Sequence, residues 1–251
     1  MNLPLDFSRI QDDGQPVALM PVHNIHFGPA RYQCYDRVRH IAKRFSIEGV
    51  GLSAGVFDEE KLAWVNRHYL KQAPPFRLAE LAVPYFQQAG IDIRPSPMAL
   101  EYLASVMTIA SESVDRLDQV PPRLSVLFSY SAEAAMADDT IRSEMSTDAA
   151  RTVARAFADE LASRPRLDRE AFRAIVNAVK TRTGQKGRAL FHPIRIVLTG
   201  RAEGPELDLI VPAIDRGAQL PTDSGVPKII GCRERAVAFA AALNAQMPQG
   251  S

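Results

Sequence analysis

The sequence predicts an all-α protein made of two packed helical bundles, with a smaller helical region in front of them. Apolar residues recur at intervals of three and four in many segments, which is the period of an amphipathic helix. Prolines and glycines separate these segments, and no strand–helix alternation suggests a nucleotide-binding parallel sheet. We therefore divide the chain into an irregular N-terminal extension followed by three helical regions: 1–35, 36–95, 96–165 and 166–251.

The N-terminal part of the sequence changes character near Asp36. The first 33 residues contain four prolines and read as irregular, apart from a short candidate strand at Val17–Met20. Helical patterns follow, and a capping aspartate at position 58 precedes an apolar stripe that we expect on one buried face: Leu62, Val65, Tyr69 and Leu70. Trp64 has the same helical spacing, so we expect it in the core as well.

Further helices are predicted along the rest of the chain, each from its own apolar stripe. Pro74 and Pro75 end the preceding helix, and Gly90 closes the next one. The predicted segments are 78–89, 97–110, 124–128, 148–161, 168–183, 186–198, 207–214 and 234–243. Residues 217–231 are rich in Gly, Pro, Ser and Asp and are expected to form a loop.

The composition indicates a globular protein without a membrane span, in a reducing compartment. A chain of 251 residues with 46% hydrophobic and 24% charged residues is typical of a globular protein. No apolar run approaches the length of about 18 residues that a membrane span needs, and the N-terminus does not read as a secretion signal. Cys34 and Cys232 form neither a disulfide framework nor a metal-binding spacing, which fits a reducing, cytoplasmic environment.

A run of cations stands out against this nearly neutral chain, whose net charge is +1. No Asp or Glu interrupts residues 171–202, which include two glycines near the middle and lead into a Gly-Pro turn. The cations are Arg173, Lys180, Arg182, Lys186, Arg188, Arg195 and Arg201. Concentrated cations attract polyanions, and arginine can bind phosphate or a base edge through two hydrogen bonds. From charge alone, a solvated helix face is the simpler interpretation.

Two long motifs favour a polyanion-binding surface over a merely solvated helix face. Residues 183–207 read Thr-Gly-Gln-Lys-Gly-Arg-Ala-Leu-Phe-His-Pro-Ile-Arg-Ile-Val-Leu-Thr-Gly-Arg-Ala-Glu-Gly-Pro-Glu-Leu, which resembles the C-terminal anticodon-binding segment of bacterial glutamyl-tRNA synthetases, class I aminoacyl-tRNA synthetases. Residues 57–70 read Phe-Asp-Glu-Glu-Lys-Leu-Ala-Trp-Val-Asn-Arg-His-Tyr-Leu, which resembles the helix that joins the catalytic half of those enzymes to the anticodon half. The motifs occur in the family's order, and the resemblance extends over about residues 36–245. It implies a stem-contact-like helical region at 36–95 and two anticodon-binding helical subdomains at 96–165 and 166–251.

The resemblance implies roles for individual residues. Arg195 matches an arginine that reads the anticodon, and Gly204, Pro205 and Leu207 match the short loop packed against the anticodon bases. Positions suited to phosphate contacts correspond to Lys186 and Arg188, and Arg201 continues the same cation run. The acidic residues Asp138, Asp139, Glu144 and Asp148 are expected on a solvated face away from the tRNA.

The resemblance also implies what the chain lacks. Only about 35 residues precede the matched region, so we expect a tRNA-binding module, for a tRNA of the tRNA-Glu type, without aminoacylation activity of its own. Residues 25–31, Ile-His-Phe-Gly-Pro-Ala-Arg, resemble the family's ATP signature, but Pro29 replaces a small residue and no supporting sheet is predicted. His23 and His26 lack a third ligand, so neither a metal nor another cofactor is expected.

Two alternatives remain open. The chain could be a fragment or split subunit of a glutamate–tRNA ligase that works with a separate catalytic domain. It could also be a protein-interaction module in which the family's RNA-binding surface has become a contact with another protein. Ser113, at a position where many family members are basic, and Asp208, where some are apolar or aromatic, motivate this second alternative.

Overall fold

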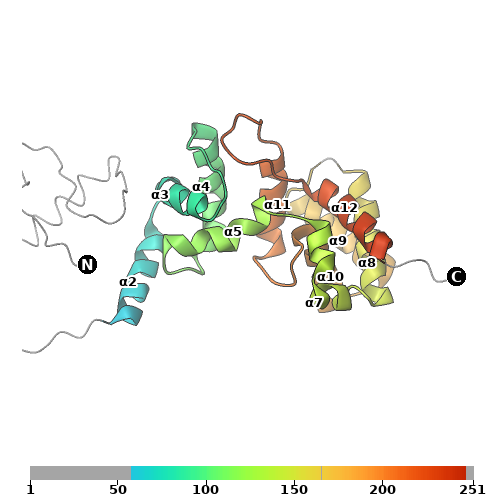
Figure 1. Ribbon diagram of the computed structural model, residues 1–251. Coiled ribbons are helices and arrows are strands. Elements are labelled where there is room, and N and C mark those ends of the chain that lie inside the picture. Colours follow the sequence, from blue (N-terminus) through green and yellow to red (C-terminus); the bar gives the residue numbers. More distant parts are fainter. Residues whose placement is uncertain (1–57, 165, 247–251) are drawn as a thin grey trace, which may run out of the picture. The chain divides into compact units, whose positions relative to one another are not determined.

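The computed structural model describes residues 58–164 and 166–246, and every regular element in this part of the chain is a helix. The all-α prediction is therefore confirmed (Figure 1). The elements are α2 (Glu59–Gln72), α3 (Pro75–Gln88), α4 (Pro97–Ser111), η3 (Leu117–Gln119), α5 (Val120–Phe128), α6 (Ala132–Ala137), α7 (Asp139–Glu144), α8 (Asp148–Ala162), α9 (Arg169–Thr183), α10 (Arg188–Thr199), α11 (Leu207–Ala218) and α12 (Cys232–Gln246).

Some predictions concern residues outside those that the structure describes. They are the irregular region 1–35, the strand at Val17–Met20, the histidines His23 and His26, the ATP-like segment 25–31, Cys34 and the first part, 36–57, of the helical region predicted over 36–95. Among the described helices, none is long and apolar enough to cross a membrane.

Short polar side chains set where several helices begin. Ser96 accepts a hydrogen bond from the amide of Ala99 at the start of α4, and Asp168 accepts one from the amide of Ala171 at the start of α9. At the start of α8 the cap is Thr147, and Asp148 is the first helical residue. Such caps satisfy amide groups that the first helical turn leaves without a partner.

The sequence pattern missed two helices, α6 and α7. Each has six residues, which is too short to display a helical period. Ser131 caps α6, and Asp138 caps α7 by accepting hydrogen bonds from the amides of Thr140 and Ile141. Their position matters for function, because α7 brings Glu144 against α10.

The prediction for α2 was wrong about which side chains are buried. Leu70 is buried, but Leu62 is 54% exposed, Tyr69 53% and Trp64 65%. The ring of Trp64 instead stacks on that of His68 on the surface of the same helix. The amphipathic pattern is real, but no neighbouring helix in the described part of the chain covers most of its apolar residues.

The hydrophobic core is formed by helix pairs that are adjacent in sequence and by pairs that lie further apart, such as α8 with α10 and with α12. α3 packs on α4, and α8 packs on α9, with the rings of Phe157 and Phe172 in an edge-to-face contact 6.5 Å apart. Phe86 and Phe128 make a similar contact between α3 and α5. The predicted boundary at residue 95 falls between the packed helices α3 and α4, and the division into three helical regions stays a prediction.

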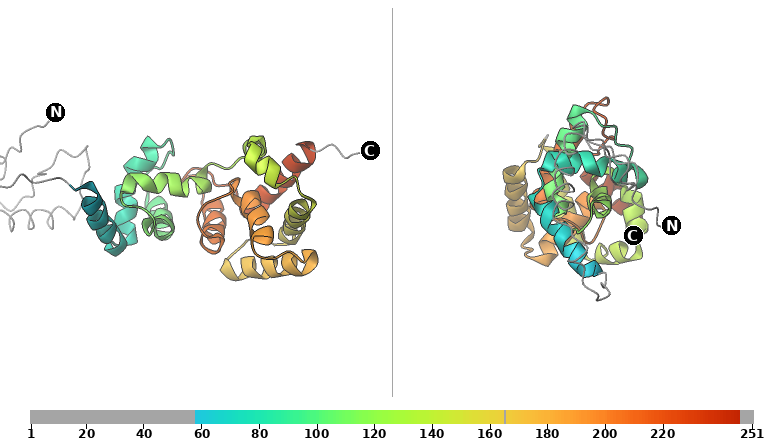
Figure 2. Two further views of the ribbon diagram at one scale, coloured as in Figure 1. Left: turned by 90° about the horizontal axis from the view of Figure 1, so that it is seen from below. Right: turned by 90° about the vertical axis from the view of Figure 1, so that its left-hand side faces the viewer.

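Helix α11 connects the earlier helices to the later ones. It contacts α4 and α5 as well as α9 and α12, and it lies between them in Figures 1 and 2. The carboxylate of Asp215 in α11 accepts hydrogen bonds from the amides of Leu167 and Cys232, at 2.6 and 2.7 Å. Asp215 therefore fixes the start of α12. The preceding loop was predicted over residues 217–231, but Gly217 and Ala218 belong to α11, so the loop begins at residue 219.

A buried arginine joins the ends of two helices in the core. Arg235 of α12 is 0% exposed, and its guanidinium donates hydrogen bonds at 2.7–2.9 Å to the carbonyls of Val126, Leu127, Leu198 and Ile230. The first two carbonyls belong to the last turn of α5 and the third to the last turn of α10. Terminal carbonyls lack intrahelical partners and carry the negative end of the helix dipole, so they can accommodate a buried cation.

The ring of Tyr130 completes this buried cluster. It lies 4.7 Å from the guanidinium carbon of Arg235, within the range of a cation–π contact. The Tyr130 hydroxyl is within hydrogen-bond distance of the carbonyls of Val197 and Arg235. The cluster thus holds the C-terminal end of α10, from which the candidate interface continues.

Candidate nucleic-acid interface

Helix α10 presents a polar face that follows directly from its sequence. Arg188, His192 and Arg195 are spaced by four and three residues, so they share one face of the helix, while Leu190, Ile194, Ile196, Val197 and Leu198 are buried on the other. The helix begins after Gly187 and ends at Gly200, whose left-handed conformation (φ +65°) suits a residue without a Cβ.

Residues 200–206, which we call the corner, turn the chain from α10 into α11. The Nη1 atom of Arg195 donates a hydrogen bond to the carbonyl of Pro205 at 2.6 Å, so the corner is held against the polar face of α10. Gly204 has a φ of +154°, and a Cβ added there would lie 3.6 Å from the same Nη1 atom. The Thr199 hydroxyl lies 2.7 Å from the carbonyl of Arg195 and 3.2 Å from that of Arg201.

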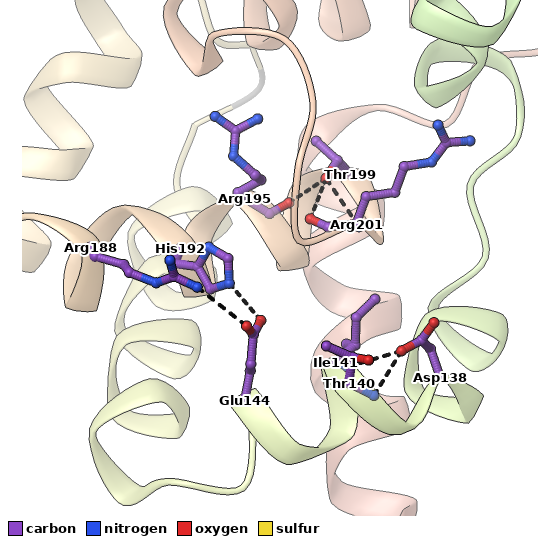
Figure 3. A network of polar contacts seen from close by, with 9 residues as sticks. All are labelled: Asp138, Thr140, Ile141, Glu144, Arg188, His192, Arg195, Thr199 and Arg201. Carbon is purple, nitrogen blue, oxygen red and sulfur yellow. Dashed lines mark hydrogen bonds and ion pairs between the residues drawn. The ribbon is translucent and has the colours of Figure 1, made fainter.

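An acidic residue from α7 forms part of the same face. Glu144 Oε2 lies 2.5 Å from His192 Nε2, and Glu144 Oε1 lies 3.5 Å from the Nη2 atom of Arg188. Figure 3 shows Glu144 pointing toward these two side chains, whereas the guanidinium groups of Arg195 and Arg201 point away from it. Glu144 was expected on a solvated face, but its side chain is half-buried against α10, because the short helix α7 packs its end there. Its expected distance from a bound tRNA stays a prediction.

The run of seven cations is only partly neutralised. Arg173 pairs with Asp208, Arg182 pairs with Asp159, and Arg188 pairs loosely with Glu144. Within residues 58–164 and 166–246, no carboxylate lies within ion-pair distance of the other four cations: Lys180, Lys186, Arg195 and Arg201. Positive charge thus remains available on α10 and in the segments that flank it.

The structure gives Asp208 an internal role. Its carboxylate accepts hydrogen bonds from the Nε and Nη2 atoms of Arg173 in α9, with the Nε contact at 2.8 Å, and its carbonyl accepts one from Arg169. The carboxylate therefore ties α11 to α9. This contact explains an acidic residue at position 208 without any external partner.

The residues expected to bind a ligand differ in accessibility. Lys186, Arg188, Arg201 and Gly204 are exposed, whereas Arg195 and Pro205 are half-buried. Leu207 is only 6% exposed and belongs to the core, so its side chain fixes the C-terminal end of the corner to the core. Burial lowers the pKa of Arg195 from its usual value, but an arginine remains protonated at neutral pH.

The sequence interpretation missed two residues of this face and one core residue that holds the end of α10. Glu144 lies far from α10 in sequence, so only the packing of α7 reveals it. His192 was not singled out, although its spacing from Arg188 and Arg195 places it on their face. Arg235 looks like an ordinary surface arginine in sequence. Among the described residues, no group of three or more His, Cys, Asp or Glu side chains could hold a metal ion.

Comparison with known proteins relates this arrangement to a family. The model of the anticodon binding domain family matches residues 77–220. The glutamate–tRNA ligase of Desulforamulus reducens is 31% identical over 182 residues, which are 71% of this chain and 37% of that protein. The glutamate–tRNA ligase of Listeria welshimeri is 34% identical over 175 residues, which are 69% of this chain and 35% of that protein.

A solved structure has the same fold. It is the crystal structure of a glutamate tRNA ligase from Elizabethkingia meningosepticum in complex with its amino acid, with a TM-score of 0.58 and 13% sequence identity. The match covers 81% of this chain and 36% of that one. The chain thus spans little more than a third of the proteins that it resembles.

Proposed function

Because the chain belongs to the anticodon-binding domain family, we propose that α10 and the corner form the anticodon-facing surface of a tRNA-binding module. The observation that carries the proposal is the arrangement at Arg195. Its guanidinium holds the Pro205 carbonyl through one N–H group, and in the described part of the chain it makes no other side-chain hydrogen bond. An arginine has five N–H donors, so four remain for a nucleotide beside the corner.

The proposed roles follow from chemistry and exposure. Lys186, Arg188 and Arg201 are exposed cations that would neutralise phosphates, which gives affinity without sequence preference. Arg195 and the backbone of the corner would contact unpaired bases, because proteins read RNA sequence mainly in single-stranded loops. Among these residues, Leu207 would act only through the position that it gives the corner.

We further propose a tRNA of the tRNA-Glu type as the ligand and the cytoplasm as the place of action. Similarity to glutamate–tRNA ligases supports this narrower choice. The proposal assigns recognition to these residues and no chemical step.

The proposal is tested by measuring binding of a tRNA-Glu transcript by filter retention, with an isolated anticodon stem-loop as competitor. We expect competition by the stem-loop and a linear fall of log K with log salt. For three or four neutralised phosphates, the slope would be about −2 to −4. Binding that is insensitive to salt and to the stem-loop would refute the proposal and favour a protein-interaction module.

A second candidate function is a subunit that works with a separate catalytic domain. The exposed side chains of Leu62 and Tyr69, seven residues apart on one face of α2, favour it, because neighbouring exposed apolar side chains often mark a contact surface. Glutamate-dependent ATP–pyrophosphate exchange distinguishes the candidates. We expect no exchange by the chain alone, whereas exchange that appears only after a catalytic domain is added would support the second candidate.

A further inference from the structure

The apolar side chain of Phe191 lies on the outside of α10. Phe191 is 45% exposed, although every other large apolar residue of this helix is buried. Among the described residues, its ring makes no contact with another aromatic ring. The burial of Leu190, Ile194 and Val197 already fixes α10 against the core, so the packing of the fold does not account for an aromatic residue here.

The position of Phe191 relates it to the cations of the same face. It follows Arg188 by three residues and precedes Arg195 by four, which are the spacings of neighbours on a helix surface. At a rise of about 1.5 Å per residue, the backbone of Phe191 lies between those of the two arginines, about 4.5 Å and 6 Å from them along the axis. The outer face of α10 therefore presents a cation, an aromatic ring and a second cation in order.

This order matches the chemistry of an unpaired nucleotide strand. Arginines bind the phosphates, and an aromatic ring between them offers a flat apolar surface on which a base can stack. Every base has such a surface, so stacking adds affinity without selecting one base. Glu144 holds His192 beside this row, which leaves Phe191 as the accessible ring.

We propose that Phe191 is a stacking platform for one unpaired base of the bound RNA. The inference rests on the proposed function, because it assigns the base to the RNA that the surface of α10 would bind. Stacking on Phe191 would add to the phosphate contacts and to the corner a contact that does not depend on charge. Stacking would keep the base beside the guanidinium of Arg195, which then contacts its edge or the next phosphate.

The test compares Phe191→Leu with Phe191→Tyr in binding to an anticodon stem-loop of tRNA-Glu. Stacking is worth about 1–3 kcal/mol per base, so Phe191→Leu is expected to weaken binding by about 5- to 150-fold. Phe191→Tyr should keep most of the affinity, because tyrosine also has a stacking face. Phe76→Leu is the matched control, because Phe76 is 47% exposed on α3, and it should leave binding unchanged.

Two further measurements separate stacking from other effects of the substitution. The slope of log K against log salt should stay the same in Phe191→Leu, since no charge is lost, and should become shallower by about 0.7–0.9 in Arg188→Ala. Stem-loops that carry a single abasic nucleotide should reveal one position at which the missing base weakens the wild-type chain but not Phe191→Leu. Leucine is a good helix former, so circular dichroism should report an unchanged fold.

The outcomes distinguish the two levels of the proposal. If the wild-type chain does not bind the stem-loop, the proposed function fails. If the wild-type chain binds and Phe191→Leu binds equally well, the stacking platform is refuted while the proposed function stands. A loss in Phe191→Leu that is the same for every abasic stem-loop would also refute stacking, because the contact would then not involve a particular base.

Discussion

The Nη1 atom of Arg195 and the carbonyl oxygen of Pro205 are joined by a 2.6 Å hydrogen bond that spans the turn between α10 and α11. The guanidinium is thereby fixed before any ligand arrives, and so is the backbone of the corner. A side chain held in this way loses less rotational freedom on binding than a free surface arginine does. The hydrogen bond therefore links the conformation of the corner to the orientation of the residue expected to read a base.

Replacement of this arginine should affect sequence-specific binding most. In Arg195→Ala, we expect affinity for an anticodon stem-loop of tRNA-Glu to fall by about 5- to 150-fold, because the base contact and the fixed corner are both lost. Affinity for an unrelated unpaired RNA should fall less. Fluorescence anisotropy with both RNAs measures the difference, and Arg123→Ala on the exposed surface of α5 controls for lost charge. Equal losses on the two RNAs would argue against base readout.

Removal of the acidic residue on the basic face should strengthen binding. Glu144→Gln eliminates a negative charge beside Arg188 and His192, so phosphates meet a more positive surface. Exposed ion pairs are worth about 0.2–1 kcal/mol, so we expect a gain of up to about fivefold at low salt and little change in stability. Glu101→Gln, on the exposed side of α4, is the charge-matched control. Weaker binding by Glu144→Gln would show that Glu144 serves to orient the cations.

The buried arginine should be important for stability. Arg235→Met leaves four carbonyls without their donor, and we expect the free energy of unfolding to drop by at least about 3 kcal/mol. For a chain of this size the melting temperature would fall by roughly 6–12 °C. Chemical denaturation measures the loss, and Arg233→Met on the exposed side of α12 should be nearly neutral. Similar stabilities of the two variants would contradict the assigned role.

Alkaline pH should destabilise the chain through Cys232. Burial, and then the charge of Asp215, raise the pKa of this thiol. Above about pH 8.5 the unfolded thiol loses its proton while the folded one keeps it, so the unfolded state binds fewer protons and stability falls as pH rises. The limiting slope is about 1.4 kcal/mol per pH unit. Denaturation under reducing conditions should show a steeper decline from pH 8.5 to 10 in the wild type than in Cys232→Ala. Parallel profiles would exclude this contribution.

The helices of the fold could be predicted because their apolar stripes are local. Phe157 and Phe172 each lie on a pattern contained within one helix, and the structure brings the two rings together. The same reasoning failed for Trp64. Periodicity shows that a helix has an apolar face, but it does not show whether another element covers that face.

The site could be predicted only in part, for a related reason. Arg195 and Pro205 lie close in sequence within one motif, so both were identified, although not their hydrogen bond. Glu144 is 48 residues away from its partner His192, and Arg235 reaches carbonyls 37, 108 and 109 residues away. Contacts over such separations depend on how the helices pack, which a charge pattern does not contain.

The position of Arg235 has a consequence for dividing the protein into pieces. A chain that stops before α12 would lose the guanidinium that donates to the carbonyls of Val126, Leu127 and Leu198, even though α5 and α10 would still be present in full. A minimal RNA-binding fragment therefore has to extend through α12, although the proposed contacts end near residue 207. A synthetic peptide of residues 232–246, added to the truncated chain, would be the natural candidate for restoring its fold by complementation.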